Sequence, residues 1–145
     1  MRKQVREAVV KTLTEYNIGT VQDTPFIPKI PEDEGHVWAI YTRSEAPSNL
    51  YQPTLTTEFR EITLDVACWV VGSEGYANKI DTYDARIHQV FHRNQDFGLN
   101  DITSVYFQQF TAETPEQVGQ KTLCLGRWSF GVVYPYNLNT RAEGL

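Results

Sequence analysis

The stretch Arg60–Val71, with the sequence REITLDVACWVV, decides the fold of this chain. Apolar residues recur at every second position along it, which is the period of a β-strand that has one side on a hydrophobic core. One face carries Ile62, Leu64, Val66, Cys68 and Val70, and the other carries Glu61, Thr63, Asp65, Ala67 and Trp69. We therefore predict a strand whose first face packs on a core and whose second face is turned elsewhere.

Two segments show the period of an amphipathic helix. Tyr76–Arg93 gathers its apolar residues in one stripe, and Arg2–Asn17 does the same, with Gly19 following as a stop. The stripes contain Val5, Ala8, Val9, Leu13 and Tyr16 in the first helix, and Tyr76, Ile80, Tyr83, Ile87, Val90 and Phe91 in the second. Each helix needs an apolar sheet face to cover.

Three more strands are predicted, at Val37–Thr42, Ile102–Phe110 and Thr122–Tyr134, with a hairpin loop over Thr111–Gln120. The order of elements is therefore α-β-β-α-β-β. It predicts the α+β class, with two helices packed on one face of a mixed or antiparallel sheet of about four main strands. Residues 1–136 form a single domain, and short connections favour antiparallel pairs on either side of the second helix.

Three segments lack a core pattern. Residues 20–36 contain Pro25, Pro28 and Pro31 and are predicted to be a Pro-rich connector, while residues 137–145 are predicted to be a flexible C-terminal tail. Residues 43–57 are long for a loop in a compact domain, and such loops are usually functional or disordered, so we predict a mobile loop. The predicted subunit or partner interface in these segments consists of Leu50, Tyr51, Leu55, Asn137 and Leu138.

Composition excludes several classes of function. The chain has 145 residues, 41% of them hydrophobic, and a formal net charge of −5. A dedicated nucleic-acid binder needs a surplus of Lys and Arg, so this acidity argues against one. No apolar run approaches the length that spans a bilayer. Cys68 and Cys124 are predicted to be small buried apolar residues, with a disulfide as the alternative if their strands are neighbours.

The candidate catalytic and metal-binding groups are weak. His88 and His92 have the i, i+4 spacing of two metal ligands, but Gln89 stands where the zincin motif needs a Glu. Asp84 and His88 are also four residues apart, which more often means a surface pair. Gly72–Gly75 lacks the Lys and the frame of a P-loop. We predict no catalytic residues, no cofactor, no metal and no enzymatic activity.

The second face of the strand at Arg60–Val71 allows two interpretations. Glu61 and Asp65 would present carboxylates in a row along it. The simpler interpretation is a solvated sheet face, which antiparallel sheets commonly have. In a ring whose sheets face inward, the same two residues would line an acidic lumen.

In its order of elements the chain resembles the tail terminator proteins of long, non-contractile-tailed phages, the lambda minor tail protein U type. The likeness covers most of the sequence: the Arg-rich first helix, the strand Val37–Thr42 before a polar loop, the long strand Glu61–Val71, a helix containing Ile87 and Val90, and the pair Ile102–Val105 and Trp128–Tyr134. These are pattern matches without an invariant signature. The segment Pro25–Pro31 and the tail Asn137–Leu145 depart from the family.

The resemblance implies a virion protein at the head-proximal end of the tail, present in the host cytoplasm during assembly. It implies a homo-hexameric ring that sits on the last ring of the tail tube, stops tube growth and offers its other face to the head-completion protein. DNA would pass through the lumen without specific binding. The loop at 43–57 would be mobile in the monomer and become ordered on assembly.

Two alternatives remain open at this stage. One is a head-closure protein, another neck protein or a tail-completion protein with a related fold. The other is a small α+β ligand-binding or isomerase domain, whose pocket would be lined by aromatic residues. A closed apolar cavity that holds Asp65 or His36 would favour that last alternative.

Overall fold

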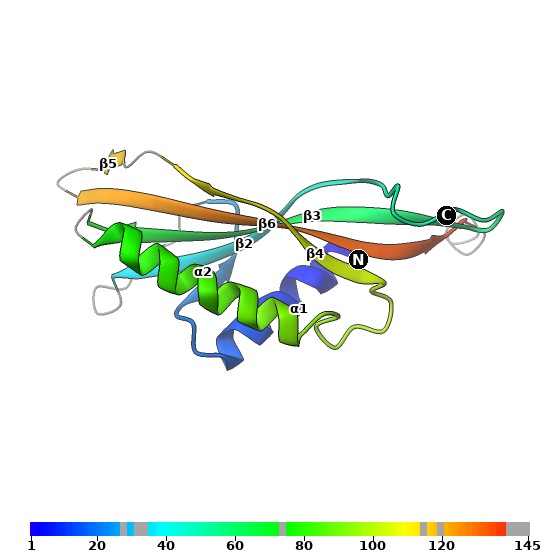
Figure 1. Ribbon diagram of the computed structural model, residues 1–145, viewed down its shortest axis with the longest axis horizontal. Coiled ribbons are helices and arrows are strands. Elements are labelled where there is room, and N and C mark those ends of the chain that lie inside the picture. The colour runs from blue at the N-terminus through cyan, green and yellow to red at the C-terminus, as the bar shows by residue number, and fades with distance from the viewer. Residues whose placement is uncertain (27–28, 31–34, 73–74, 114–115, 119–120, 139–145) are drawn as a thin grey trace.

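The computed structural model describes residues 1–26, 29–30, 35–72, 75–113, 116–118 and 121–138. It belongs to the α+β class, with two helices and a mixed sheet of six strands. In chain order the elements are α1 (Arg2–Glu15), β1 (Val21–Asp23), β2 (His36–Pro47), β3 (Thr57–Val71), α2 (Tyr76–Arg93), β4 (Ser104–Ala112), β5 (Glu116–Val118) and β6 (Lys121–Asn137). Figure 1 shows both helices on the same side of the sheet.

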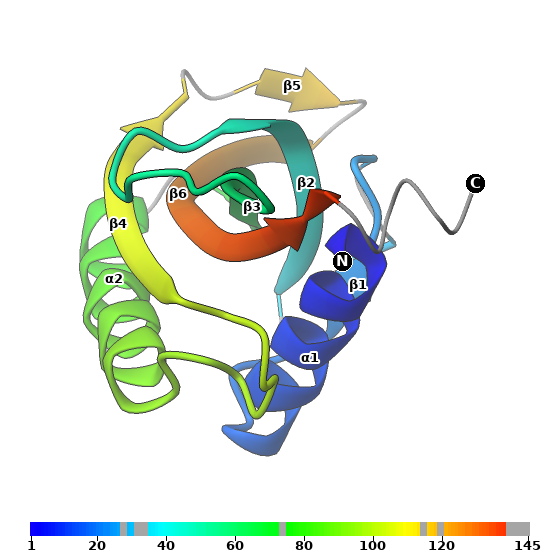
Figure 2. The same cartoon turned by 90° about the vertical axis from the view of Figure 1, so that its right-hand side faces the viewer.

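The sheet has the strand order β1-β2-β3-β6-β4, with β5 paired to β6. Every pairing is antiparallel except that of β1 with β2. The longest ladder joins β3 to β6 without a register shift, from Thr57 opposite Asn137 to Val71 opposite Leu123. The end-on view in Figure 2 shows how strongly these long strands twist and curl.

The main core lies between the helices and the sheet, where the alternation in Arg60–Val71 placed it. Its buried residues come from α1, α2, the strands β2, β3 and β6, and the segments that follow the two helices, and they form one cluster. The face of β3 predicted to be apolar is fully covered: Ile62, Leu64, Val66, Cys68 and Val70 are all buried. In α2, Ile80, Ile87 and Val90 are buried, while Lys79, Arg86 and Gln89 are exposed, as the stripe predicted.

The second face of β3 is not simply solvated, contrary to the sequence prediction. Ala67 and Trp69 are buried there together with Val37 and Ala39 of β2, and Leu125 of β6 packs against them. Side chains of neighbouring strands cover each other on this face, because the sheet curls around it (Figure 2). Alternation alone does not reveal such curling.

Two short strands were missed. β1 lies inside the predicted connector at 20–36, and β5 lies inside the predicted hairpin loop. Each has three residues, too few for a period of two to appear in the sequence. The rest of the connector contains Ile27–Pro28 and Pro31–Glu34, which are outside the described residues.

β2, β3 and β6 are longer than predicted, and the extension of β2 and β3 shortens the predicted loop at 43–57. β2 continues to Pro47 and β3 begins at Thr57, so only residues 48–56 connect them. The extra residues of β2 are polar, and they are held by the ladder to β3, with a bulge between Thr42 and Ser44. Backbone pairing supplies the order that side-chain hydrophobicity did not indicate.

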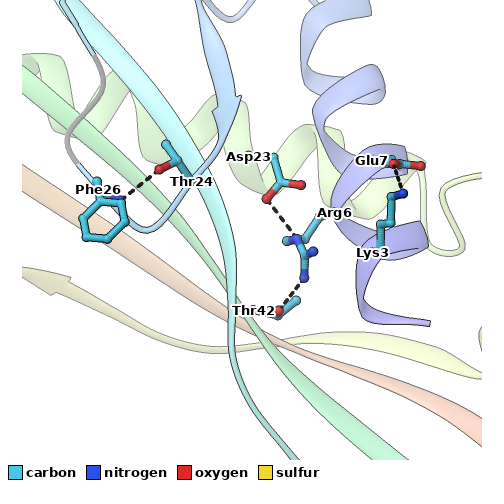
Figure 3. Close-up of polar contacts among 7 residues, drawn as sticks. All are labelled: Lys3, Arg6, Glu7, Asp23, Thr24, Phe26 and Thr42. Atoms are coloured by element: carbon cyan, nitrogen blue, oxygen red, sulfur yellow. Dashed lines mark hydrogen bonds and ion pairs between the residues drawn. The ribbon is translucent and has the colours of Figure 1, made fainter.

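A guanidinium fixes α1 to the edge of the sheet. Nε of Arg6 lies 2.9 Å from Oδ1 of Asp23 in β1, and Nη1 donates a 2.8 Å hydrogen bond to Oγ1 of Thr42 in β2 (Figure 3). Lys3 and Glu7 form a looser pair on the outer side of the same helix, at 3.9 Å. Neither described helix has the length and apolar character of a membrane span.

Leu64 and Leu55 offer a matched test of where the core lies. Leu64 is completely buried, whereas Leu55 is 98% exposed. We expect Leu64→Ala to lower the free energy of unfolding by about 2–5 kcal/mol, because it removes buried methyl groups and leaves a cavity. Leu55→Ala should change it by about 0.5 kcal/mol or less. Urea unfolding followed by tryptophan fluorescence measures both, and similar losses in the two variants would contradict this packing.

Candidate functional site

The residues predicted to form an interface lie together at one end of the sheet. This end is built by residues 47–60 and 134–138, and we call it the sheet tip. Thr57 pairs with Asn137, the backbone N–H of Leu138 donates to the carbonyl of Thr56 at 2.7 Å, and the N–H of Ser48 donates to the carbonyl of Phe59 at 2.7 Å. Segments that are 80 residues apart in the sequence therefore meet at the sheet tip, which projects beyond both helices (Figure 1).

Apolar side chains are exposed at the sheet tip. Leu55 is 98% exposed and Leu50 is 60% exposed, and Leu138 is also largely exposed. Tyr51 is half-buried and packs its ring against that of Phe59, with 5.0 Å between centroids. Residues 47–53 with Glu58 and Phe59 line an open hollow of about 540 Å³. Exposed apolar groups gathered in one place are typical of an interaction surface.

Charged groups stiffen the strands that carry this surface. Nε of Arg60 lies 2.7 Å from Oε1 of Glu58, and its guanidinium stacks 3.6 Å from the ring centroid of Tyr136. The hydroxyl of Tyr134 donates a 2.6 Å hydrogen bond to Glu45 of β2. The hydrogen bond from Arg60 to Glu58 also raises the pKa of Arg60. These contacts stabilise β2, β3 and β6 next to the connection that carries Leu50 and Leu55.

Asp65 does not form an exposed acidic row with Glu61. Its side chain is fully buried; Oδ1 accepts a 2.7 Å hydrogen bond from the hydroxyl of Ser129, and Oδ2 lies 3.0 Å from Nε of Arg43. Glu61 is half-buried and accepts hydrogen bonds from the hydroxyl of Tyr106 at 2.5 Å and from Nε2 of Gln108 at 3.2 Å. In the single chain, Asp65 therefore contributes no surface charge, and Glu61 stays the one candidate of the pair for a lumen wall.

The surroundings of Asp65 form a polar cluster on the sheet face away from the helices. Tyr41 lies opposite Asp65 in the β2–β3 ladder, and burial together with the Asp65 charge raises the pKa of its phenol. Arg127 of β6 is close to Tyr41 and pairs with Glu113 at 2.8 Å. A carboxylate whose two oxygens both have donors is poorly suited to take a proton from a substrate. Neither Asp65 nor His36 lines the hollow at the sheet tip.

Of the two histidines in α2, His88 pairs with Asp84 at the surface and His92 is exposed. Nε2 of His88 lies 3.2 Å from Oδ1 of Asp84, as the i, i+4 spacing predicted, and His92 is exposed. The structure adds a role for Asp84 that the sequence did not indicate, since the indole N–H of Trp128 donates to it at 2.7 Å. In the described part of the chain, no three His, Cys, Asp or Glu residues gather in a way that holds a metal ion.

Cys68 and Cys124 are both buried as free thiols. They lie on adjacent strands but in different rows, since Cys68 is opposite Gly126 and Cys124 is opposite Val70. Burial raises the pKa of both thiols, which leaves them unreactive. They act as small core residues, as the sequence predicted.

Sequence analysis missed one surface, the edge strand β4. Tyr106, Phe107 and Phe110 are each at least one-third exposed. Phe107 packs edge-on against His88, and Phe110 lies beside Trp128. The sequence feature that could have indicated this surface is the complete lack of charge in Ser104–Ala112, which is unusual for an edge strand.

Comparison with known proteins gives the fold little context. No protein-family model matches the chain, and no curated protein matches it. Solved structures do match. One of them, a protein known only by a sequence identifier, aligns over 91% of this chain and 95% of its own with a TM-score of 0.47 and 13% sequence identity. A likeness at this level carries no conclusion about function.

The buried carboxylate provides a test of the polar cluster. We expect Arg43→Gln to lower the free energy of unfolding by about 1–3 kcal/mol, because it leaves the buried charge of Asp65 without its cation. Adding Asp65→Asn should restore part of that loss. Lys3→Gln, which breaks an exposed pair, should have no measurable effect. Urea unfolding of the unchanged protein and the three variants measures the free energy of unfolding. Equal losses of this free energy in Arg43→Gln and in Arg43→Gln/Asp65→Asn would show that Asp65 does not depend on Arg43.

Proposed function

We propose that this chain is a phage tail terminator, which forms a closed ring on the end of the tail tube. The observation that supports this best is the sheet tip, which projects beyond the helices (Figure 1) and brings together all five residues of the predicted interface, from the connection between β2 and β3 and from the end of β6. The ring stops tube polymerisation and provides the surface for head–tail joining. Its partners are other copies of itself, the tail tube protein and a head-completion protein.

The physical requirements of a terminator match this surface. Closed cyclic symmetry limits assembly sideways, and a face that does not match the tube limits it along the axis. Among the described residues, Leu50 stays 60% exposed and Leu55 98% exposed, and burial of this surface against a partner is favourable at about 25 cal/mol per Å². The half-buried Glu61 and the net charge of −5 agree with a lumen that does not hold DNA.

The sheet tip also serves a neck or tail-completion protein, so location in the virion separates these alternatives. A ligand-binding or isomerase domain has less support, because the carboxylate of Asp65 is bound by Ser129 and Arg43 rather than facing a cavity. The terminator makes no use of catalytic residues, a metal or a cofactor.

Imaging tests the proposal directly. We expect electron microscopy of the purified protein, alone and mixed with tail tubes, to show rings, and labelled protein to lie at the head-proximal end of head-free tails. Native mass spectrometry gives the number of copies, for which six is expected. Label on tail-free heads would identify a head-closure protein instead. A protein that is strictly monomeric in assembled particles would end the ring proposal.

Charges placed at the sheet tip test its role. We expect the double variant Leu50→Asp/Leu55→Asp to fold normally, because both side chains are exposed, but to give overlong or headless tails. The matched control Gln89→Asp/Gln95→Asp adds the same two charges at exposed positions in and after α2 and should assemble normally. Circular dichroism checks the fold, and tail lengths are measured by electron microscopy. Normal tails from the tip variant would exclude the sheet tip from assembly.

A further inference from the structure

The edge strand β4 has no charged residue and no Pro, which are common protections of a sheet edge. It pairs with β6 on one side, and no strand among the described residues covers its other side. An open edge presents unpaired N–H and C=O groups to other strands. Natural edges are therefore often protected by charged residues, especially Lys, or by Pro. The sequence of β4, SVYFQQFTA, contains none of these. A bulge between Phe107 and Gln109 is its one irregularity.

On the opposite edge of the sheet, the later part of β2 has no further strand beside it among the described residues, although it contains Arg43, Glu45 and Pro47 and Arg6 of α1 reaches Thr42. β1 pairs with β2 at Trp38–Ile40, and beyond them Tyr41–Pro47 pairs with β3 alone as far as the structure describes the chain. The two charged side chains on this part of β2 have partners of opposite charge within the chain. Arg43 is paired with Asp65, and Glu45 lies 3.9 Å from the guanidinium of Arg60. This edge therefore does not repel an uncharged strand.

Exposed aromatic side chains accompany both edges. On the β4 side they are Tyr106, Phe107 and Phe110. On the β2 side, Phe26 is 77% exposed, a few residues after β1. The backbone N–H of Phe26 donates to the hydroxyl of Thr24 (Figure 3), and the N–H of Thr24 donates to the carbonyl of Ile40 in β2. Apolar surface is thus available on both sides of a contact between the two edges.

Strand directions show how the two edges fit. β2, β3, β6 and β4 are neighbours in that order and each pairing is antiparallel, so β2 and β4 run in opposite directions. A second copy related by rotation about an axis along the strands keeps its strand directions. Its β2 then runs antiparallel to β4 of the first copy, which continues the alternation of the sheet.

We propose that the open edge of β4 pairs with Tyr41–Pro47 of β2 in a second copy of this chain. Each copy uses a different edge on each side, so the contact is heterologous and closes into a ring when the rotation closes. The contact deepens the proposed terminator function and rests on it: it identifies the surface that joins neighbours within the ring, whereas the sheet tip lies at the ends of the strands.

Crosslinking between the two edges tests the pairing. The variants are Ser44→Cys in β2, Gln108→Cys in β4 and the two combined, treated with a short bismaleimide at the protein concentration where rings or oligomers form. The native thiols are buried and should not react. We expect a ladder of crosslinked oligomers from the combined variant and none from either single variant. Dimers from Gln108→Cys alone would show that β4 pairs with β4, which overturns the proposal.

Lysines on the β4 edge give a second readout. Gln109→Lys/Thr111→Lys should weaken self-association by about tenfold or more in sedimentation velocity, because charge on an edge strand opposes pairing. The matched control Gln4→Lys/Gln89→Lys changes exposed helix positions and should leave self-association unchanged. Rings that form without edge crosslinks and tolerate the lysines would refute this contact while the terminator function stands. A protein that stays monomeric up to millimolar concentration also refutes the contact between β4 and β2. Electron microscopy of tails then tests the terminator function separately.

Discussion

The uninterrupted ladder between β3 and β6 is the constraint on which the rest of the structure depends. It runs from Thr57 opposite Asn137 to Val71 opposite Leu123. Most of the ladder carries the apolar face that both helices cover, and its end at Thr57–Arg60 and Tyr134–Asn137 belongs to the sheet tip, which projects beyond the helices (Figure 1). Because pairing is continuous, the exposed end has the same register as the core. The core therefore fixes the position of a surface that has little packing of its own.

Polar groups on the sheet are arranged so that buried charge is balanced within the chain. Asp65, whose side chain is fully buried, is held by Arg43 and Ser129. Isolated buried charges are costly, so such partners are needed wherever the curled sheet excludes water. The apolar groups that stay exposed include the leucines of the sheet tip and the aromatic residues beside the two sheet edges. That distribution suits a protein that completes its packing against copies of itself.

The sequence predicted those features that local periodicity encodes. The bounds of α2, the buried face of β3 and the α+β class follow from the spacing of apolar residues, which a helix or strand must place on one side. Leu50 and Leu55, which were predicted to belong to an interface because they are apolar residues in a segment without a core pattern, are exposed in the structure. The polar end of β2 and the three-residue β1 were missed, since backbone pairing with a distant strand holds them.

By itself, then, the sequence determined which residues belong to helices and strands and which faces seek a core, because both depend on neighbours within a few positions. Only the tertiary structure decided that Asn137 and Leu138 lie beside the loop at the sheet tip, that Asp65 is buried against Arg43, and that β4 ends the sheet. These features depend on strand order and on the curl of the sheet. Both arise from contacts between segments far apart in the chain, and no spacing within one segment records them.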